Sequence, residues 1–175
     1  MEKKISVDEY FRYPESNRPM ELVYGYVREP AMPSFGHEAI LLRIAEVLGP
    51  HVREHALGKI GRADVVLDKD AALVVQPDLF FISNERLRLV DERVWGAPDL
   101  VIEIASPSTE YRDRTLKLEW FRRYGVRECW LVYPRDQRIE VVDCEGNRRE
   151  SFAGEARIRS TVLPDLAVPA KECFS

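Results

Sequence analysis

The sequence predicts an α/β protein in which a mixed β-sheet is flanked by helices, and three observations support this fold class. The chain has 175 residues, 45% of them hydrophobic and 32% charged, which is typical of one compact domain spanning residues 1–175. Residues 99–105 and 126–133 form apolar, β-prone runs with a helical pattern between them, an order that indicates a parallel strand pair joined by a right-handed crossover. Residues 138–142 and 148–152 flank a turn at residues 145–147, which predicts an antiparallel hairpin added to this core.

The N-terminal part of the chain carries signals for two helices and a pair of strands. Residues 6–9 match a capping box that should open a short helix ending before residue 14. Residues 20–29 are expected to be extended, with a turn near residue 25. Apolar residues recur at helical spacing from residue 36 onwards, and the Gly49-Pro50 pair should weaken or end that helix.

The middle of the chain should supply further strands of the sheet. Residues 60–67 and 74–82 are β-prone, and Pro77 requires a sheet edge, a strand start or a bulge within the second run. Asn84 should cap a short charged helix that extends to residue 94. The run at residues 99–105 is apolar on both faces, so we expect it to be a central strand.

Charge, cysteine content and hydropathy exclude several classes of protein. The 26 Lys+Arg and 30 Asp+Glu residues give a formal net charge of −4, which does not favour a wide, non-specific coat of nucleic acid. Basic residues cluster at 86–93 and 112–127, as either a solvated helix face or a local groove. Three widely spaced cysteines argue against a disulfide framework or a zinc site. No apolar run approaches the roughly 20 residues of a membrane span, and the first residues lack a signal-peptide core. We therefore expect a cytoplasmic protein with no membrane partner.

Two carboxylates stand in strands that otherwise carry almost no charge, Asp78 and Glu103. Burial of an unpaired carboxylate is costly and raises its pKa, so two such groups suggest a shared positive partner. Asp99 lies on the same strand face as Glu103, but at about 3.3 Å per residue the two are about 13 Å apart. Asp78 is therefore the better partner for Glu103 at a common site.

The helix that follows residue 109 supplies a candidate cation. At about 100° per residue, Lys117 falls inside the apolar arc of Trp120 and Phe121 and should point at the sheet. The opposite side should face water; it carries Arg112, Glu119, Arg122 and Arg123, and Leu118 falls on it as an apolar exception. Asp113 lies one turn earlier, so a local Asp113–Lys117 pair, or a lysine that reaches back to water, is the alternative.

Two strand carboxylates and one lysine at a common point suit metal-assisted hydrolysis. Mg²⁺ prefers oxygen ligands and retains waters, so Asp78 and Glu103 would hold it, with Mn²⁺ as a substitute. The ion would polarise a phosphodiester and make hydroxide from bound water. Lys117 would orient that water and stabilise the negative charge that develops on phosphorus.

These residues belong to a longer series of motifs that covers nearly the whole chain. The series is Glu21-Leu22-x-x-Gly25, His37 at the head of a helix, Gln76-Pro77-Asp78-Leu79-x-Phe81, Ala97-Pro98-Asp99-Leu100-Val101-x-Glu103-x-x-Ser106-Pro107-Ser108-Thr109, Asp113-x-x-x-Lys117 and Tyr124-Gly125-Val126-x-Glu128-x-Trp130-Leu131-Val132-x-Pro134. It resembles the Uma-two (Uma2) family of the restriction-endonuclease-like, PD-(D/E)XK nuclease superfamily. The resemblance implies a restriction-endonuclease-like core, a central mixed sheet flanked by helices, and metal-dependent cleavage of DNA.

The resemblance also implies roles for individual residues. Asp78 matches the metal-binding aspartate, Glu103 the second acidic ligand and Glu21 an early acidic residue that completes the metal shell. The lysine expected two places after the glutamate is Ala105 here, and the displaced lysine of this family matches Lys117. By superfamily analogy, cleavage of both strands of a duplex would need a homodimer.

Several expectations remain open at this level. Glu21 is equally compatible with a surface strand position. His37 and Ser106 are candidate substrate contacts, but a helix-start or packing role for His37 and a strand stop and helix cap for Ser106 explain them as well. The function expected first is a DNA endonuclease; the alternative is a catalytically inactive nucleic-acid-binding or protein-interaction domain that retains the fold.

Overall fold

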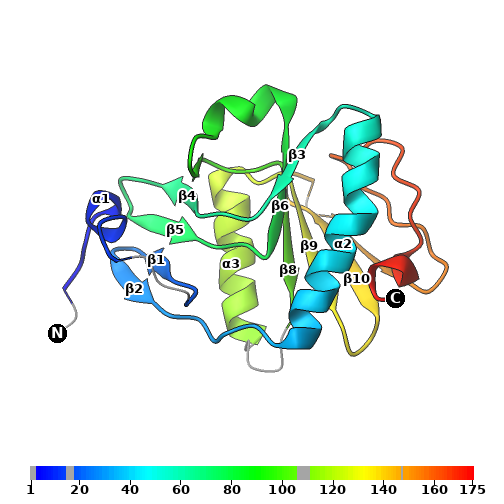
Figure 1. The fold of residues 1–175 in the computed structure, drawn as a ribbon, viewed down its shortest axis with the longest axis horizontal. Coiled ribbons are helices and arrows are strands. Elements are labelled where there is room, and N and C mark those ends of the chain that lie inside the picture. Colours follow the sequence, from blue (N-terminus) through cyan, green and yellow to red (C-terminus); the bar gives the residue numbers. More distant parts are fainter. Residues whose placement is uncertain (1–2, 15–17, 106–110, 147) are drawn as a thin grey trace.

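The computed structural model of the chain describes residues 3–14, 18–105, 111–146 and 148–175, with the side chains of residues 111–114 left out (Figure 1). It contains a six-stranded sheet of order β11-β10-β9-β8-β6-β3 and a five-stranded sheet of order β2-β1-β5-β4-β7. The strands of the larger sheet are β3 (Gly58–Gly61), β6 (Leu79–Ser83), β8 (Leu100–Ile104), β9 (Glu128–Tyr133), β10 (Arg138–Asp143) and β11 (Arg148–Ala153). Those of the smaller sheet are β1 (Glu21–Val23), β2 (Tyr26–Arg28), β4 (Val65–Asp68), β5 (Leu73–Val75) and β7 (Val94–Trp95).

Two longer helices flank the larger sheet, α2 (Phe35–Glu54) and α3 (Tyr111–Tyr124). The shorter helical elements are α1 (Val7–Tyr10) and the 3₁₀ turns η1 (Asn84–Leu89) and η2 (Ala170–Cys173). Ser6 and Glu9 form the expected capping box at the start of α1. None of the helices formed by the described residues combines the length and hydropathy that a bilayer crossing needs.

The parallel crossover is present, because β8 pairs in parallel with β9 and α3 lies between them in the chain. β8 is central, with β9 on one side and the antiparallel β6 on the other. The predicted hairpin is β10 and β11, although residue 147 of its turn lies outside the described residues. The expectation of a mixed sheet flanked by helices is thus confirmed.

The two faces of the larger sheet pack against different partners, as alternation along a strand requires (Figure 1). The face against α2 buries Leu79, Phe81, Leu100, Ile102, Trp130 and Val132. The opposite face buries Phe80, Ile82, Val101, Cys129 and Leu131 against α3 and the five-stranded sheet. Glu103 alternates with Val101 and Asp78 with Phe80, so both carboxylates belong to the face that α3 covers.

Four local expectations were wrong. Of the two outcomes expected at Gly49-Pro50, a weakened helix or its end, the second is wrong, because α2 continues to Glu54. Pro50 removes only one helical hydrogen bond, while the buried side chains of Leu48 and Val52 keep both sides of it packed on the sheet. The predicted helix to residue 94 is only the 3₁₀ turn η1, followed by the short strand β7.

The other two errors concern strand continuity and one helix position. Each of the two expected strands is divided between the two sheets. Residues 60–67 contribute to β3 of the larger sheet and β4 of the smaller one, and residues 74–82 contribute to β5 of the smaller sheet and β6 of the larger one. The second division falls at Gln76-Pro77, where proline cannot donate to a ladder. Leu118 is buried in the core beneath α3 rather than facing water, because the five-stranded sheet covers that side of the helix.

Candidate active site

Asp78 lies where the chain passes from the smaller sheet to the larger one, directly before β6. The register pairs Leu79 with Ile102, so its continuation sets Asp78 opposite Glu103. The backbone N–H of Ile104 donates to Asp78 Oδ2 over 2.7 Å. Strand pairing therefore brings together two carboxylates that are 25 positions apart in the sequence.

Glu103 stands in the middle of the site with its carboxylate only partly satisfied. Its side chain is 12% exposed, and its Oε2 lies 3.6 Å from Lys117 Nζ. Its Oε1 is buried and has no hydrogen-bond partner among the described residues. A buried oxygen without a donor is costly unless a proton or a cation satisfies it.

Lys117 on α3 joins carboxylates from both sheets. Its Nζ lies 2.8 Å from Glu21 Oε1 in addition to its contact with Glu103. Glu21, in β1, is buried and also accepts the backbone N–H of Gln76 over 3.1 Å. The lysine thus points at the sheet, while the side chain of Asp113, the alternative local partner, lies outside the described part of the chain.

The charges of this cluster shift two pKa values. Burial raises the pKa of Glu103 to about 8, and Asp78 and Glu21 add to the rise, whereas Lys117 opposes it. Burial acts to lower the pKa of Lys117, but Glu103, Glu21 and Asp78 outweigh it, so the net shift is upward. Burial therefore favours the protonated form of Glu103, while the neighbouring carboxylates favour the charged form of Lys117.

His37, at the start of α2, contacts the same cluster. The hydroxyl of Ser34 accepts the His37 backbone N–H over 3.3 Å and caps the helix, and the ring Nε2 lies 3.1 Å from Asp78 Oδ2. The hydrogen bond to Asp78 raises the pKa of His37 despite the opposing effect of burial. In this structure the histidine holds Asp78, and a substrate contact of His37 stays a prediction. Ser106 lies outside the described residues.

Asp99 is separate from the site, as its strand position predicts. Its buried carboxylate accepts the backbone N–H of Ser83 over 2.7 Å and pairs with Arg86 and Arg127 at 3.5 and 3.4 Å. These contacts bind η1, β8 and the segment before β9 together, which is a structural role.

The donor set suits a hard cation such as Mg²⁺. Asp78 and Glu103 offer only oxygen, and the unsatisfied Glu103 Oε1 is a ligand atom held inside the site. Within the described ranges no group of three His, Cys, Asp or Glu side chains is already spaced to hold an ion. Mg²⁺ commonly keeps several waters and uses one or two protein carboxylates, so two carboxylates fit this ion.

A cavity of about 190 Å³ opens onto two members of this cluster. It is lined by Glu21, Arg28, Glu29, Pro30, Leu116, Lys117 and Trp120. We call this space the catalytic cavity because it opens onto the candidate active site. Through it the side chain of Lys117, which is 19% exposed, meets solvent.

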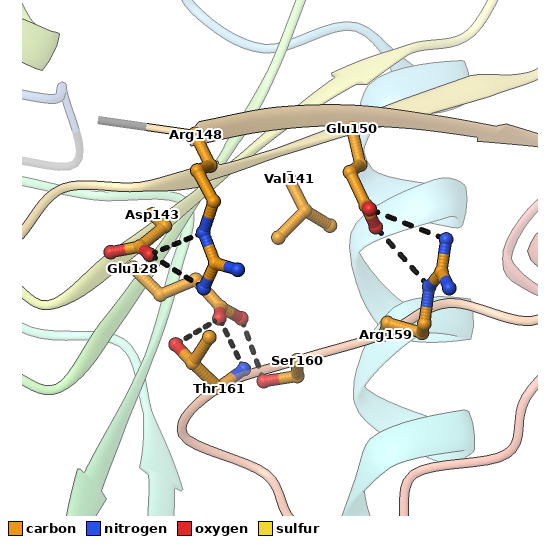
Figure 2. Close-up of a pocket in the computed structure, with 8 residues that line it drawn as sticks. All are labelled: Glu128, Val141, Asp143, Arg148, Glu150, Arg159, Ser160 and Thr161. Atoms are coloured by element: carbon orange, nitrogen blue, oxygen red, sulfur yellow. Dashed lines mark hydrogen bonds and ion pairs between the residues drawn. The ribbon is translucent and has the colours of Figure 1, made fainter. Parts of the chain in front are cut away.

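A second cavity, of about 240 Å³, lies beside β11 and centres on Glu128 (Figure 2). The fully buried Glu128 accepts four hydrogen bonds of 2.6–2.7 Å, two from Thr161 and one each from Ser160 and the Trp130 indole. Figure 2 also shows Arg148 paired with Asp143 and Arg159 with Glu150.

These charged groups are paired within the protein, so the second cavity leaves few polar groups for a ligand. Glu128 instead anchors the segment around Thr161 to the larger sheet. Sequence reasoning assigned Glu128 no role. Its signal was the one that identified Asp78 and Glu103, a charge inside the apolar run at residues 128–133.

Comparisons with known proteins agree with this architecture. A solved structure described as "a putative nuclease belonging to DUF820 from Anabaena variabilis ATCC 29413" superposes with a TM-score of 0.82, at 22% sequence identity, over 97% of each chain. No curated protein matches the chain. The family model Uma2, described as "Putative restriction endonuclease", matches residues 7–171. The sequence resemblance is thereby confirmed, and the chain belongs to the Uma2 family of restriction-endonuclease-like proteins.

Proposed function

We propose that this protein is a Mg²⁺-dependent endonuclease that hydrolyses DNA phosphodiester bonds, with Mn²⁺ as a substitute ion. The observation that carries the proposal is the position of Lys117, within 4 Å of Glu21 and Glu103, beside the Glu103–Asp78 pair. A partly buried lysine that lines a cavity, beside a carboxylate oxygen that no donor satisfies among the described residues, supplies groups that phosphodiester hydrolysis needs. Membership in the Uma2 family supports the same reaction class.

Each residue has a distinct role in this proposal. Asp78 and Glu103 bind the ion and Glu21 assists them; the bound ion supplies a polarised phosphodiester and a water of lowered pKa. Lys117 orients the attacking water and stabilises the charge that develops on the phosphoryl oxygens. His37 donates to Asp78 Oδ2 and keeps the other oxygen of that carboxylate directed at the site. Glu21 fixes Lys117 through its 2.8 Å ion pair.

The deciding experiment combines metal binding with nicking of supercoiled plasmid. Glu103→Gln is the sharpest variant, since glutamine resembles the protonated Glu103 of the metal-free protein and should leave folding intact. We expect calorimetry to detect Mg²⁺ and Mn²⁺ binding to the wild type and no binding to Glu103→Gln or Asp78→Asn, with nicking lost in parallel. Asp70→Asn is the matched control, since Asp70 is exposed in the turn between β4 and β5.

Two outcomes would overturn the proposal. A wild type that neither binds the ions nor nicks plasmid would make the cluster a closed structural network, and the inactive binding domain would take its place. Cleavage of RNA with intact DNA would keep the site and change the substrate.

The proposed assembly is a homodimer, because one site cuts one strand at a time. Sedimentation velocity should then give the mass of two chains. A monomer that only nicks plasmid would refute the dimer and leave the active site unaffected.

A further inference from the structure

Arg28 occupies a position in the catalytic cavity that strand pairing determines. It lies in β2 directly opposite Glu21 of β1, and residues opposite each other in an antiparallel pair project from the same face about 5 Å apart. Both line the catalytic cavity, together with Lys117. The side chain of Arg28 therefore lines the same cavity as Lys117, the proposed catalytic lysine.

The carboxylates around Arg28 are engaged elsewhere. An arginine opposite a glutamate in a sheet normally pairs with it, but Glu21 binds Lys117 at 2.8 Å. Glu29, the other acidic residue of the cavity, lies 3.8 Å from Arg18. Among the described residues, the Arg28 side chain makes no ion pair or hydrogen bond.

The other cations near the site contrast with Arg28. Arg62 pairs with Glu38 at 3.2 Å, and Lys117 is shared between two carboxylates. Arg28 is exposed, but the partly apolar wall of Leu116, Pro30 and the buried Trp120 lowers the dielectric on one side and strengthens its field. A planar guanidinium with its donors unused is suited to two parallel hydrogen bonds with a phosphate.

We infer that Arg28 binds a backbone phosphate of the nucleic acid substrate in the catalytic cavity. The ligand chemistry is a phosphodiester anion, and the contact places the backbone against Lys117. The inference rests on the proposed nuclease function and names the group that holds its substrate. Arg28 is a substrate-binding residue and takes no proton in the reaction.

The test measures binding without cleavage. Fluorescence anisotropy of a labelled DNA duplex in EDTA, over a series of KCl concentrations, gives the affinity and its salt dependence. Each phosphate neutralised contributes about −0.9 to the slope of log K against log [salt] on duplex DNA. Arg28→Ala should therefore weaken binding at low salt and reduce the magnitude of that slope by about 0.9. Arg28→Lys should keep the slope, because it keeps the charge, and lose part of the affinity with the second hydrogen bond.

The matched control is Arg148→Ala. Arg148 pairs with Asp143. It lies in β11, an edge strand of the larger sheet three strands away from β8, and its register is level with Glu128 of β9 and Leu100 of β8. It should change neither affinity nor slope. Equal slopes for wild type, Arg28→Ala and Arg148→Ala would overturn the inference, as would a wild type that binds no DNA duplex in EDTA.

Plasmid nicking separates this inference from the proposed function. An Arg28→Ala protein that nicks with wild-type KM would refute the inference alone. A wild type that binds DNA with a steeper salt dependence than Arg28→Ala, and yet cleaves no plasmid, would support the phosphate contact and refute the nuclease function.

Discussion

The raised pKa of Glu103 predicts that ion binding to this site depends on pH. An ion must displace the proton that Glu103 holds, so affinity should rise with pH up to the pKa of about 8 and level off above it. At pH 7 about one tenth of the Glu103 carboxyls are ionised, which weakens apparent Mg²⁺ affinity by about tenfold, or about 1.4 kcal/mol, relative to pH 9. About 0.9 proton should leave per ion bound at pH 7 and about 0.1 at pH 9.

Calorimetry in buffers of different ionisation enthalpy measures this proton directly. The observed binding enthalpy should vary with the buffer at pH 7, with a slope equal to the number of protons released. At pH 9 the variation should nearly vanish. Asp70→Asn should reproduce the wild-type slope, because Asp70 lies in an exposed turn.

Two results would refute the reasoning. Equal affinity at pH 7 and pH 9, with no proton released, would mean that Glu103 is already ionised in the metal-free protein or does not bind the ion. A Glu103→Gln variant with unchanged affinity and proton release would assign the proton to another group.

Three further predictions concern stability and positioning. The unfolding temperature of the metal-free protein should fall as pH rises from about 4.5 to about 8, because the pKa of Glu103 is raised from 4.5 to about 8 and the stability from its folded-state proton is lost over that interval, with His37, whose pKa is also raised, adding to the fall; a flat curve that Glu103→Gln leaves unchanged would contradict this. His37→Ala should weaken Mn²⁺ binding by about 10- to 100-fold while His37→Gln, whose amide can still donate to Asp78, restores most of it, and equal affinities in calorimetry would exclude the positioning role. Glu128→Gln should lose about 3 kcal/mol in urea unfolding, since two of its four donors would then meet an amide N–H₂, with unchanged Mn²⁺ affinity; a loss below about 1 kcal/mol would contradict it.

Local pattern was sufficient for the elements whose neighbours in space are their neighbours in the chain. The crossover from β8 through α3 to β9 followed from an apolar run, a helical period and a second apolar run. The hairpin of β10 and β11 followed from alternation around a turn. The placement of Lys117 toward the sheet followed from its angle among Trp120 and Phe121.

Prediction failed where a distant segment decides the outcome. Nothing local shows that residues 74–82 change sheets at Pro77, since both halves are β-prone and each finds its partner strand elsewhere. Pro50 ends a helix in isolation, but packing of α2 on the larger sheet outweighs the lost hydrogen bond. Leu118 looked exposed because the sheet that covers it lies far away in the sequence.

The residues of the candidate site divide in the same way. Asp78 and Glu103 could be named from the sequence because a charge within an apolar strand is costly to bury, and that cost is visible residue by residue. Other features depend on which side chains meet across two sheets and two helices. These are the ion pair of Lys117 with Glu21, the contact of His37 with Asp78, and the lack of a partner for Arg28 in the described part of the chain. The free-energy cost of burying a charged side chain depends on the residue itself and can be read from the sequence. The partner of that side chain depends on register and packing between distant segments, so only the folded chain determines which cation each carboxylate contacts.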